Sequence, residues 1–201
     1  MPPSRTAARM LRLMDRAVTH WHLPVIGAAK GRIIRRLIER HRPERAVEIG
    51  SLFGYSAILI AGTLGPRGRL VCVEASPYLA RFVELNVVAA GLARKVRVVV
   101  GDALRVLPLL SGRFDFALID AVKEDYLEYL RALEPRLRPG AVVVADNTGL
   151  YRRDVKPYLD YVRDPAGRYA SREYVVGDDA MEVSILRGSD GTPKGRAVRP
   201  R

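Results

Sequence analysis

The chain has 201 residues, 48% of them hydrophobic and 28% charged, and its formal net charge is +12. This length predicts one domain with a substantial core, and no apolar stretch approaches the roughly 20 residues that a membrane helix requires. The N-terminal segment lacks the apolar run of a secretion signal, and a single cysteine, Cys72, excludes a disulfide within the chain. We therefore expect a cytoplasmic protein that does not contact a membrane.

The positive charge gathers at the two ends of the chain. Residues 1–45 carry 11 Lys and Arg against 3 acidic residues, residues 187–201 carry 5 against 1, and the body between them is balanced. Basic ends can bind RNA or another polyanion. A solvated arginine-rich surface with a disordered tail is the simpler interpretation, because no aromatic side chains alternate with the charges.

Helical and extended patterns alternate along the chain. Apolar residues at helical spacing predict a first helix over 5–16 and a second around 33–38, which ends by Pro43. The later helices are expected at 55–61, 77–90, a short stretch from Asp102, 124–137 and 154–162. The strands are expected at 46–49, 70–73, 96–100, 114–119, 141–145, 169–176 and 181–186.

This alternation indicates an α/β fold, a Rossmann-like, doubly wound sheet of seven strands with helices on both faces. A turn at 177–179, not a helix, joins the last two strands, so the last strand should run antiparallel in an otherwise mostly parallel sheet. We divide the chain into N-terminal helices over 1–45, a body over 46–187 and a basic, disordered tail over 188–201. The N-terminal helices would cover a substrate or form a dimer contact.

Two of the predicted strands stop abruptly at oxygen-bearing side chains. Asp120 follows the strand at 114–119, and Asp146 and Asn147 follow the strand at 141–145. Because the carboxyl ends of parallel strands meet at one edge of a sheet, these side chains should converge. Two carboxylates and an amide carbonyl suit Mg²⁺. Either segment alone would favour a turn or helix cap, but their pairing, with Lys123 close behind Asp120, favours a metal site.

The ends of the first three strands of the body carry features of a nucleoside site. Gly50 and Gly54 permit a tight turn close to a ligand, but their spacing is not the G-x-G-x-x-G of dinucleotide sites. Glu74 ends the second of these strands, where an acid can accept hydrogen bonds from ribose hydroxyls. Asp102 follows the third and could meet an exocyclic amine. Glu48 in the first strand would repel phosphate but tolerate the sulfonium amino acid of S-adenosylmethionine.

From Ile26 to Gly188 the chain resembles the metal-dependent O-methyltransferases of the catechol and caffeoyl-CoA type, which use S-adenosylmethionine. The resemblance rests on segments 27–31, 47–56, 73–74, 101–103, 119–126 and 145–147. It implies that residues 46–187 form the methyltransferase domain. It also implies that Asp120, Asp146 and Asn147 are the metal ligands and that Lys123 is the catalytic base.

The same resemblance implies a donor site and one contact with the acceptor. Glu74 falls on the family's ribose-binding acid, and Glu173 falls on an acid that contacts the second hydroxyl of the acceptor. Val122 stands where the animal catechol enzymes have an aromatic wall. The cofactor-binding residues implied by the resemblance are Ile26, Glu48, Gly50, Ser56, Glu74, Asp102, Ala103 and Asp120.

The resemblance implies methyl transfer from S-adenosylmethionine to a small aromatic vicinal diol, with Mg²⁺ binding both oxygens and Lys123 taking the proton. A hydroxylated base of transfer RNA is the alternative acceptor, because the ends of the chain are basic. A nucleotide-cofactor oxidoreductase and a non-catalytic nucleoside-binding module are readings from other classes. The missing G-x-G-x-x-G argues against the first, and Lys123 with its metal ligands against the second. A homodimer through the N-terminal helices is compatible with the sequence.

Overall fold

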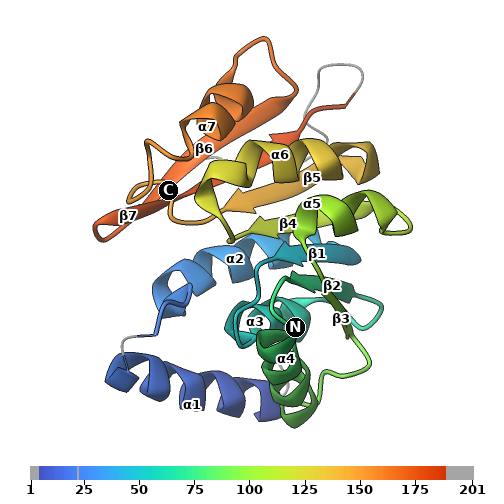
Figure 1. Cartoon of the computed structure of the whole chain (residues 1–201), viewed down its shortest axis with the longest axis vertical. Helices are drawn as coiled ribbons and strands as arrows, with labels where there is room; N and C mark the ends of the chain where they lie inside the picture. Colours follow the sequence, from blue (N-terminus) through green and yellow to red (C-terminus); the bar gives the residue numbers. More distant parts are fainter. Residues whose placement is uncertain (1–4, 22, 189–201) are drawn as a thin grey trace.

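The computed structural model of the protein describes residues 5–21 and 23–188. Its seven strands are β1 (Arg45–Ile49), β2 (Arg69–Glu74), β3 (Val96–Val100), β4 (Phe114–Ile119), β5 (Leu137–Ala145), β6 (Tyr169–Val176) and β7 (Asp179–Leu186). They form one sheet in the order β3-β2-β1-β4-β5-β7-β6 (Figure 1). All neighbouring pairs from β3 to β5 are parallel, whereas β7 is antiparallel to both β5 and β6. The predicted doubly wound fold with an antiparallel last strand is confirmed.

Helices cover both faces of this sheet (Figure 1). On one face lie α2 (Gly27–His41), α3 (Tyr55–Thr63) and α4 (Pro77–Ala89), and α1 (Arg5–Trp21) packs against α3. The other face carries α5 (Ala103–Val106), α6 (Tyr126–Leu133) and α7 (Lys156–Arg163). The described residues also contain three short 3₁₀ helices: η1 (Leu107–Leu109), η2 (Lys123–Asp125) and η3 (Glu134–Arg136).

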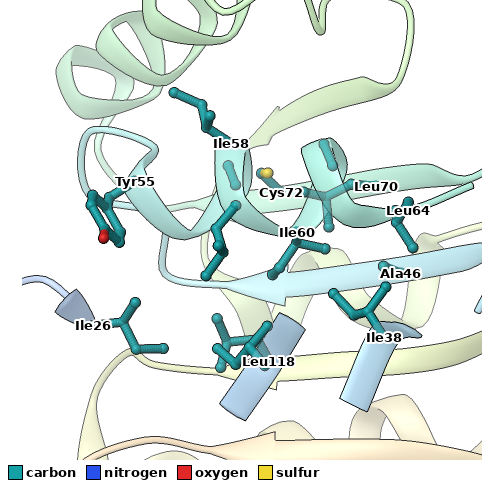
Figure 2. Close-up of a cluster of buried hydrophobic side chains, with 14 of the residues drawn as sticks. Ile26, Ile38, Ala46, Tyr55, Ile58, Ile60, Leu64, Leu70, Cys72 and Leu118 are labelled. Carbon is teal, nitrogen blue, oxygen red and sulfur yellow. The ribbon is translucent and has the colours of Figure 1, made fainter. Parts of the chain in front are cut away.

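The central strands are buried on both sides, which explains why most of their residues are apolar. Alternate residues point to opposite faces, so Leu118 packs in the cluster under α3 while Ile119 packs in the cluster under α6. Figure 2 shows the first cluster, where Ile58 and Ile60 of α3 lie over the sheet. Cys72 is fully buried there, as a small core residue.

The N-terminal helices share this core with the body of the protein. Leu11 and Met14 of α1 and Ile34 of α2 belong to the same buried cluster as the residues of α3. Helices α1 and α2 are also longer than their apolar residues indicated. The expected tail lies almost wholly outside the described residues. Within the described ranges, no helix has the length and apolar character needed to cross a membrane.

One predicted helix boundary is wrong. The helix expected over 124–137 is interrupted: η2 precedes α6, α6 ends at Leu133, and η3 contains Pro135. Leu137 already belongs to β5, and a shift of register beside Phe114 leaves Pro139 in an irregular part of that strand. Pro139 is tolerated because proline cannot donate a hydrogen bond to a regular ladder but fits an irregularity.

Candidate active site

A cavity of about 740 Å³ opens at the carboxyl ends of the parallel strands. Strands β1 and β4 lie side by side at the centre of the sheet, and the chain winds outward from them in opposite directions, which is where open α/β sheets bind ligands. Most of the residues expected to form the site line this cavity. They are Ile26, Gly50, Ser56, Glu74, Asp102, Ala103, Asp120, Lys123, Asp146 and Asn147.

Gly50 allows the loop after β1 to approach the loop after β4. Its φ of 82° lies in the left-handed region, and a Cβ atom at this position would lie 2.2 Å from the backbone oxygen of Asp120. No other residue fits without displacing that backbone. The loop after β1 and the loop after β4 are therefore in direct contact.

Glu74 at the end of β2 braces the same loop. Its Oε2 accepts hydrogen bonds from the backbone N–H groups of Ser51 and Leu52, both at 3.0 Å, and its Oε1 accepts one from Ser76 at 3.0 Å. A carboxylate offers about four acceptor positions, so three N–H bonds leave capacity for a ligand hydroxyl. Because Glu74 also lines the cavity, its free capacity is available to a bound molecule.

Glu48 is placed differently from the other expected donor-site residues. It is fully buried behind Ser51, whose hydroxyl donates to Glu48 Oε2 at 2.7 Å, and it is not part of the cavity lining. Its Oε1 has no hydrogen-bond partner among the described residues. Burial raises the pKa of Glu48 to about 7, and the neighbouring hydroxyl groups oppose this rise. Glu48 thus supports the loop from beneath.

Asp120 and Asp146 follow neighbouring strands in register. Ile119 pairs with Ala145, and the N–H of Asp146 donates to the carbonyl of Ile119 at 3.0 Å. Burial, with the charge of Asp120, raises the pKa of Asp146 to about 6 against the pull of a nearby lysine. Two carboxylates held this close favour a cation between or beside them.

Asn147 lies beside these two carboxylates, and we refer to Asp120, Asp146 and Asn147 together as the oxygen cluster. Its φ of 58° is left-handed, a conformation that asparagine adopts more readily than most residues. Among the described residues there is no group of three or more His, Cys, Asp or Glu side chains arranged to hold a metal. The ligand set expected from the sequence has only two carboxylates, together with one amide oxygen. These oxygens are hard ligands that suit Mg²⁺.

Lys123 reaches into this cluster from η2. Its Nζ donates to Asp120 Oδ1 and to Tyr126 Oη, both at 2.8 Å, and the Tyr126 hydroxyl donates to the backbone carbonyl of Asp146 at 3.1 Å. The side chain of Lys123 is only 15% exposed. This lysine is therefore held at the oxygen cluster and is not a mobile surface group.

Two charged residues directly behind the oxygen cluster, Lys30 and Asp179, were given no role from the sequence. Lys30 of α2 lies 2.5 Å from Asp146 Oδ1 and 2.6 Å from Asp179 Oδ2, with Asp179 the first residue of β7. Burial alone would lower the pKa of Lys30, but the two acids outweigh it and raise that pKa. A signal existed: Lys30 falls at helical spacing on the apolar face that includes Ile34 and Leu37.

Glu173 of β6 does not line the cavity. Its carboxylate pairs with Arg152 and with Arg163, the latter at 3.0 Å. A contact between Glu173 and an acceptor remains a prediction, and it would require the carboxylate to leave these two arginines. The mouth of the cavity is instead bordered by the exposed side chains of Val122, Leu150 and Tyr151.

Comparisons with known proteins point in the same direction. The family model described as O-methyltransferase matches residues 4–194. Catechol O-methyltransferase of Mycobacterium tuberculosis is 41% identical over 61% of this chain and 56% of its own length. The enzyme of the same name from Niastella koreensis is 34% identical over 82% of this chain and 77% of its own length. The match thus spans about half to three quarters of these two relatives.

Solved structures agree with this relationship. The O-methyltransferase TomG from Streptomyces achromogenes, in complex with SAM, superimposes with a TM-score of 0.80 and 29% identity, covering 89% of this chain and 90% of that one. An O-methyltransferase from Bacillus cereus, in complex with SAH, has a TM-score of 0.77 and 25% identity, with 93% of each chain covered.

Proposed function

The chain belongs to the family of S-adenosylmethionine-dependent O-methyltransferases, and we propose that its acceptor is a small aromatic vicinal diol bound with the help of a divalent cation. One observation carries this proposal. The glycine-rich loop and Glu74 share a single cavity with Asp120, Lys123, Asp146 and Asn147. A methyl donor bound at the first set would lie beside an acceptor bound at the second.

The oxygen cluster fits a hard cation. Asp146 is buried, and its pKa is raised by that burial and by the charge of Asp120. A cation beside both carboxylates would stabilise their ionised forms. Asp120, Asp146 and Asn147 would hold the ion, since carboxylate and amide oxygens are the ligands that Mg²⁺ prefers. When bound, a divalent ion orients two adjacent acceptor oxygens and lowers the pKa of a coordinated hydroxyl.

The residues of the chain would carry out the remaining steps. Glu74 binds the ribose hydroxyls of the donor, and Asp102 receives its exocyclic amine. Lys123, as the neutral amine, accepts the hydroxyl proton: the O–H bond breaks and an N–H bond forms. The oxygen lone pair then bonds to the methyl carbon while the C–S bond breaks, leaving S-adenosylhomocysteine. Holding both reactants in line supplies much of the acceleration.

The apolar side chains at the cavity mouth suit an aromatic acceptor. Val122 and Leu150 are 55% and 63% exposed, and Tyr151 is placed so that the Lys123 amine lies 5.7 Å from its ring centroid. An acceptor ring could pack against them while its two oxygens point inward. Such packing would bury apolar surface on both partners.

A methyl-transfer assay with labelled donor tests the proposal. Catechol, a caffeoyl thioester and bulk transfer RNA are offered separately, each with Mg²⁺ and with a chelator. We expect label in the two vicinal diols only, and only with the metal present. Label in transfer RNA alone would replace the acceptor class, and equal turnover with chelator would contradict the role of the cation.

A further inference from the structure

A buried charge network lies behind the oxygen cluster. Lys30 and Asp179 are each 8% exposed, and neither lines the cavity. They come from positions 149 residues apart and meet at 2.6 Å, while Lys30 also meets Asp146 at 2.5 Å. A buried ion pair is often no more stabilising than apolar side chains of similar volume. Its contribution to packing therefore does not by itself explain this network.

Asp179 contacts the amide of Asn147. The Nδ2 group of Asn147 donates to Asp179 Oδ2 at 2.8 Å. An ionised carboxylate only accepts hydrogen bonds, so only the NH₂ end of the amide can face it. The amide oxygen must then point to the other side, where Asn147 lines the cavity together with Asp120 and Asp146. A cation requires that oxygen, since an NH₂ group cannot be its ligand.

Backbone hydrogen bonds fix the orientation of the Asp179 carboxylate. Its Oδ1 accepts the backbone N–H groups of Gly149, Leu150 and Ala180 at 3.2, 2.9 and 2.7 Å. Gly149 permits this close approach, because a Cβ atom there would lie 2.7 Å from the backbone nitrogen of Ala180. The loop after β5 is therefore pressed onto the start of β7, with the Asp179 carboxylate at the junction.

Lys30 links Asp179 to the second oxygen ligand. Its ammonium donates a hydrogen bond to Oδ2 of Asp179 and forms an ion pair with Oδ1 of Asp146, which leaves Oδ2 of Asp146 without that contact. Asp179, behind the cluster, thus adds a third carboxylate near Asp120 and Asp146, and Lys30 and Lys123 supply two positive charges there. The positive charge on Lys30 allows Asp179 to remain an ionised acceptor close to other acids.

We propose that Asp179 is a positioning residue of the metal site, which presents the amide oxygen of Asn147 to the ion while Lys30 holds Asp179 in place. This inference rests on the proposed function, since it requires that a cation binds at Asp120, Asp146 and Asn147. Outer partners that orient metal ligands commonly change metal affinity about 10- to 100-fold when they are replaced. The alternative is a purely structural brace between α2 and β7.

The first experiment titrates the purified full-length protein with Mn²⁺ by calorimetry. We expect Asp179→Asn to weaken Mn²⁺ binding by about 10- to 100-fold, with S-adenosylmethionine affinity changed less than about 3-fold. Asp160→Asn is the matched control, because it removes an exposed pair with Lys156 on α7 by the same substitution. The control should bind Mn²⁺ as the wild type does.

A swapped pair separates positioning from bracing. In the double variant Asn147→Asp/Asp179→Asn, the amide at 179 can donate to the carboxylate at 147, whose other oxygen then faces the ion. We expect Mn²⁺ affinity at least about 5-fold higher than in Asp179→Asn, beyond the gain that Asn147→Asp gives by itself, and no such coupling if Asp179 only braces the fold. If Asp179→Asn does not fold, the swapped pair is compared with the wild type, and a loss above about 100-fold overturns the inference.

The outcomes for the two proposals are distinct. A wild-type protein that binds no Mn²⁺ refutes the metal-dependent function and this inference with it. A wild type that binds Mn²⁺ equally well after Asp179→Asn refutes only the positioning role. Loss of donor affinity together with Mn²⁺ affinity in Asp179→Asn assigns the residue to the fold and also refutes it.

Discussion

Acidic residues prevail at one edge of the central sheet and basic residues at the other. At the carboxyl edge, acids follow or end the strands: Glu74, Asp102, Asp120 and Asp146. At the amino edge, each of the five parallel strands begins with or beside a cation: Arg45, Arg69, Lys95, Arg113 and Arg138. The arrangement follows from helix direction, because parallel sheets place helix N-termini at the first edge and C-termini at the second, where anions and cations respectively are favoured.

The edges differ in what their charges bind. Lys95 donates to the backbone carbonyls of Leu64 and Ala61 at 2.7 and 3.2 Å, at the C-terminus of α3, and Arg69 donates to the carbonyl of Gly68 at 2.9 Å. These cations cap backbone groups. At the carboxyl edge, Asp120 and Asp146 lie close together and line a cavity. Cations that are bound by backbone carbonyls, such as Lys95, are structural, whereas two carboxylates held close together at a cavity indicate a ligand.

The largest effect expected is at the carboxyl edge, from Asp146→Ala. Removing this carboxylate should lower metal-dependent kcat/KM by on the order of 10³-fold, because a coordinated ion contributes several kcal/mol to the transition state. Donor affinity, measured by calorimetry, should change less than about 3-fold. Full activity of the variant in the presence of chelator would contradict the metal mechanism.

Glu74→Gln should act on the donor and not on the metal. The substitution weakens charge-assisted hydrogen bonds worth about 1.5–3 kcal/mol each, so S-adenosylmethionine should bind roughly 10- to 100-fold more weakly. Mn²⁺ affinity should match that of the wild type, since the carboxylate lies on β2 and the oxygen cluster follows β4 and β5. An unchanged dissociation constant for the donor would remove Glu74 from the site.

Glu48→Gln should change how stability depends on pH. The pKa of Glu48 rises on folding from 4.5 to about 7, so the folded state holds the proton more tightly. Its contribution to stability is therefore full below about pH 4.5 and is lost as the pH rises through 7. The Glu48→Gln variant is neutral at every pH and does not lose this contribution. The free energy of unfolding of the variant minus that of the wild type should therefore increase by about 3 kcal/mol between pH 4.5 and pH 8.

Urea unfolding of the ligand-free proteins at both pH values measures this difference. Asp146 also has a raised pKa, but it is present in both proteins and so cancels in the comparison. A difference between variant and wild type that does not change with pH would show that Glu48 does not titrate in this range.

The smallest effect belongs to the amino edge. Lys95→Met removes the cap on two carbonyls near the end of α3 and should cost about 1 kcal/mol of stability in thermal unfolding. The values of kcat/KM should stay within about 2-fold of the wild type, because this edge lies at the opposite ends of the strands from the cavity. A larger loss of activity would break the division between the edges.

The alternation of apolar runs and helical spacing was enough to predict the fold. Strands such as Val96–Val100 and Phe114–Ile119 were found with their bounds, because each is a short, mostly apolar run that is followed by a polar or glycine residue, Gly101 or Asp120. The helix over 124–137 was overextended, since leucines at helical spacing continue past Pro135 into the start of β5. Local spacing cannot show where a neighbouring strand captures the chain.

The sequence by itself determined the order of strands and helices along the chain and the acids that end the strands. A family resemblance assigned roles to Asp120, Lys123, Asp146 and Asn147. These features are local, since an apolar run and the polar residue that ends it are neighbours in the chain. Only the tertiary structure decided that Lys30 and Asp179 meet behind Asp146, that Glu48 lies beneath its loop, and that Glu173 is held by arginines. Those contacts join distant segments, and their energies depend on burial and charge pairing that exist only once the chain has folded.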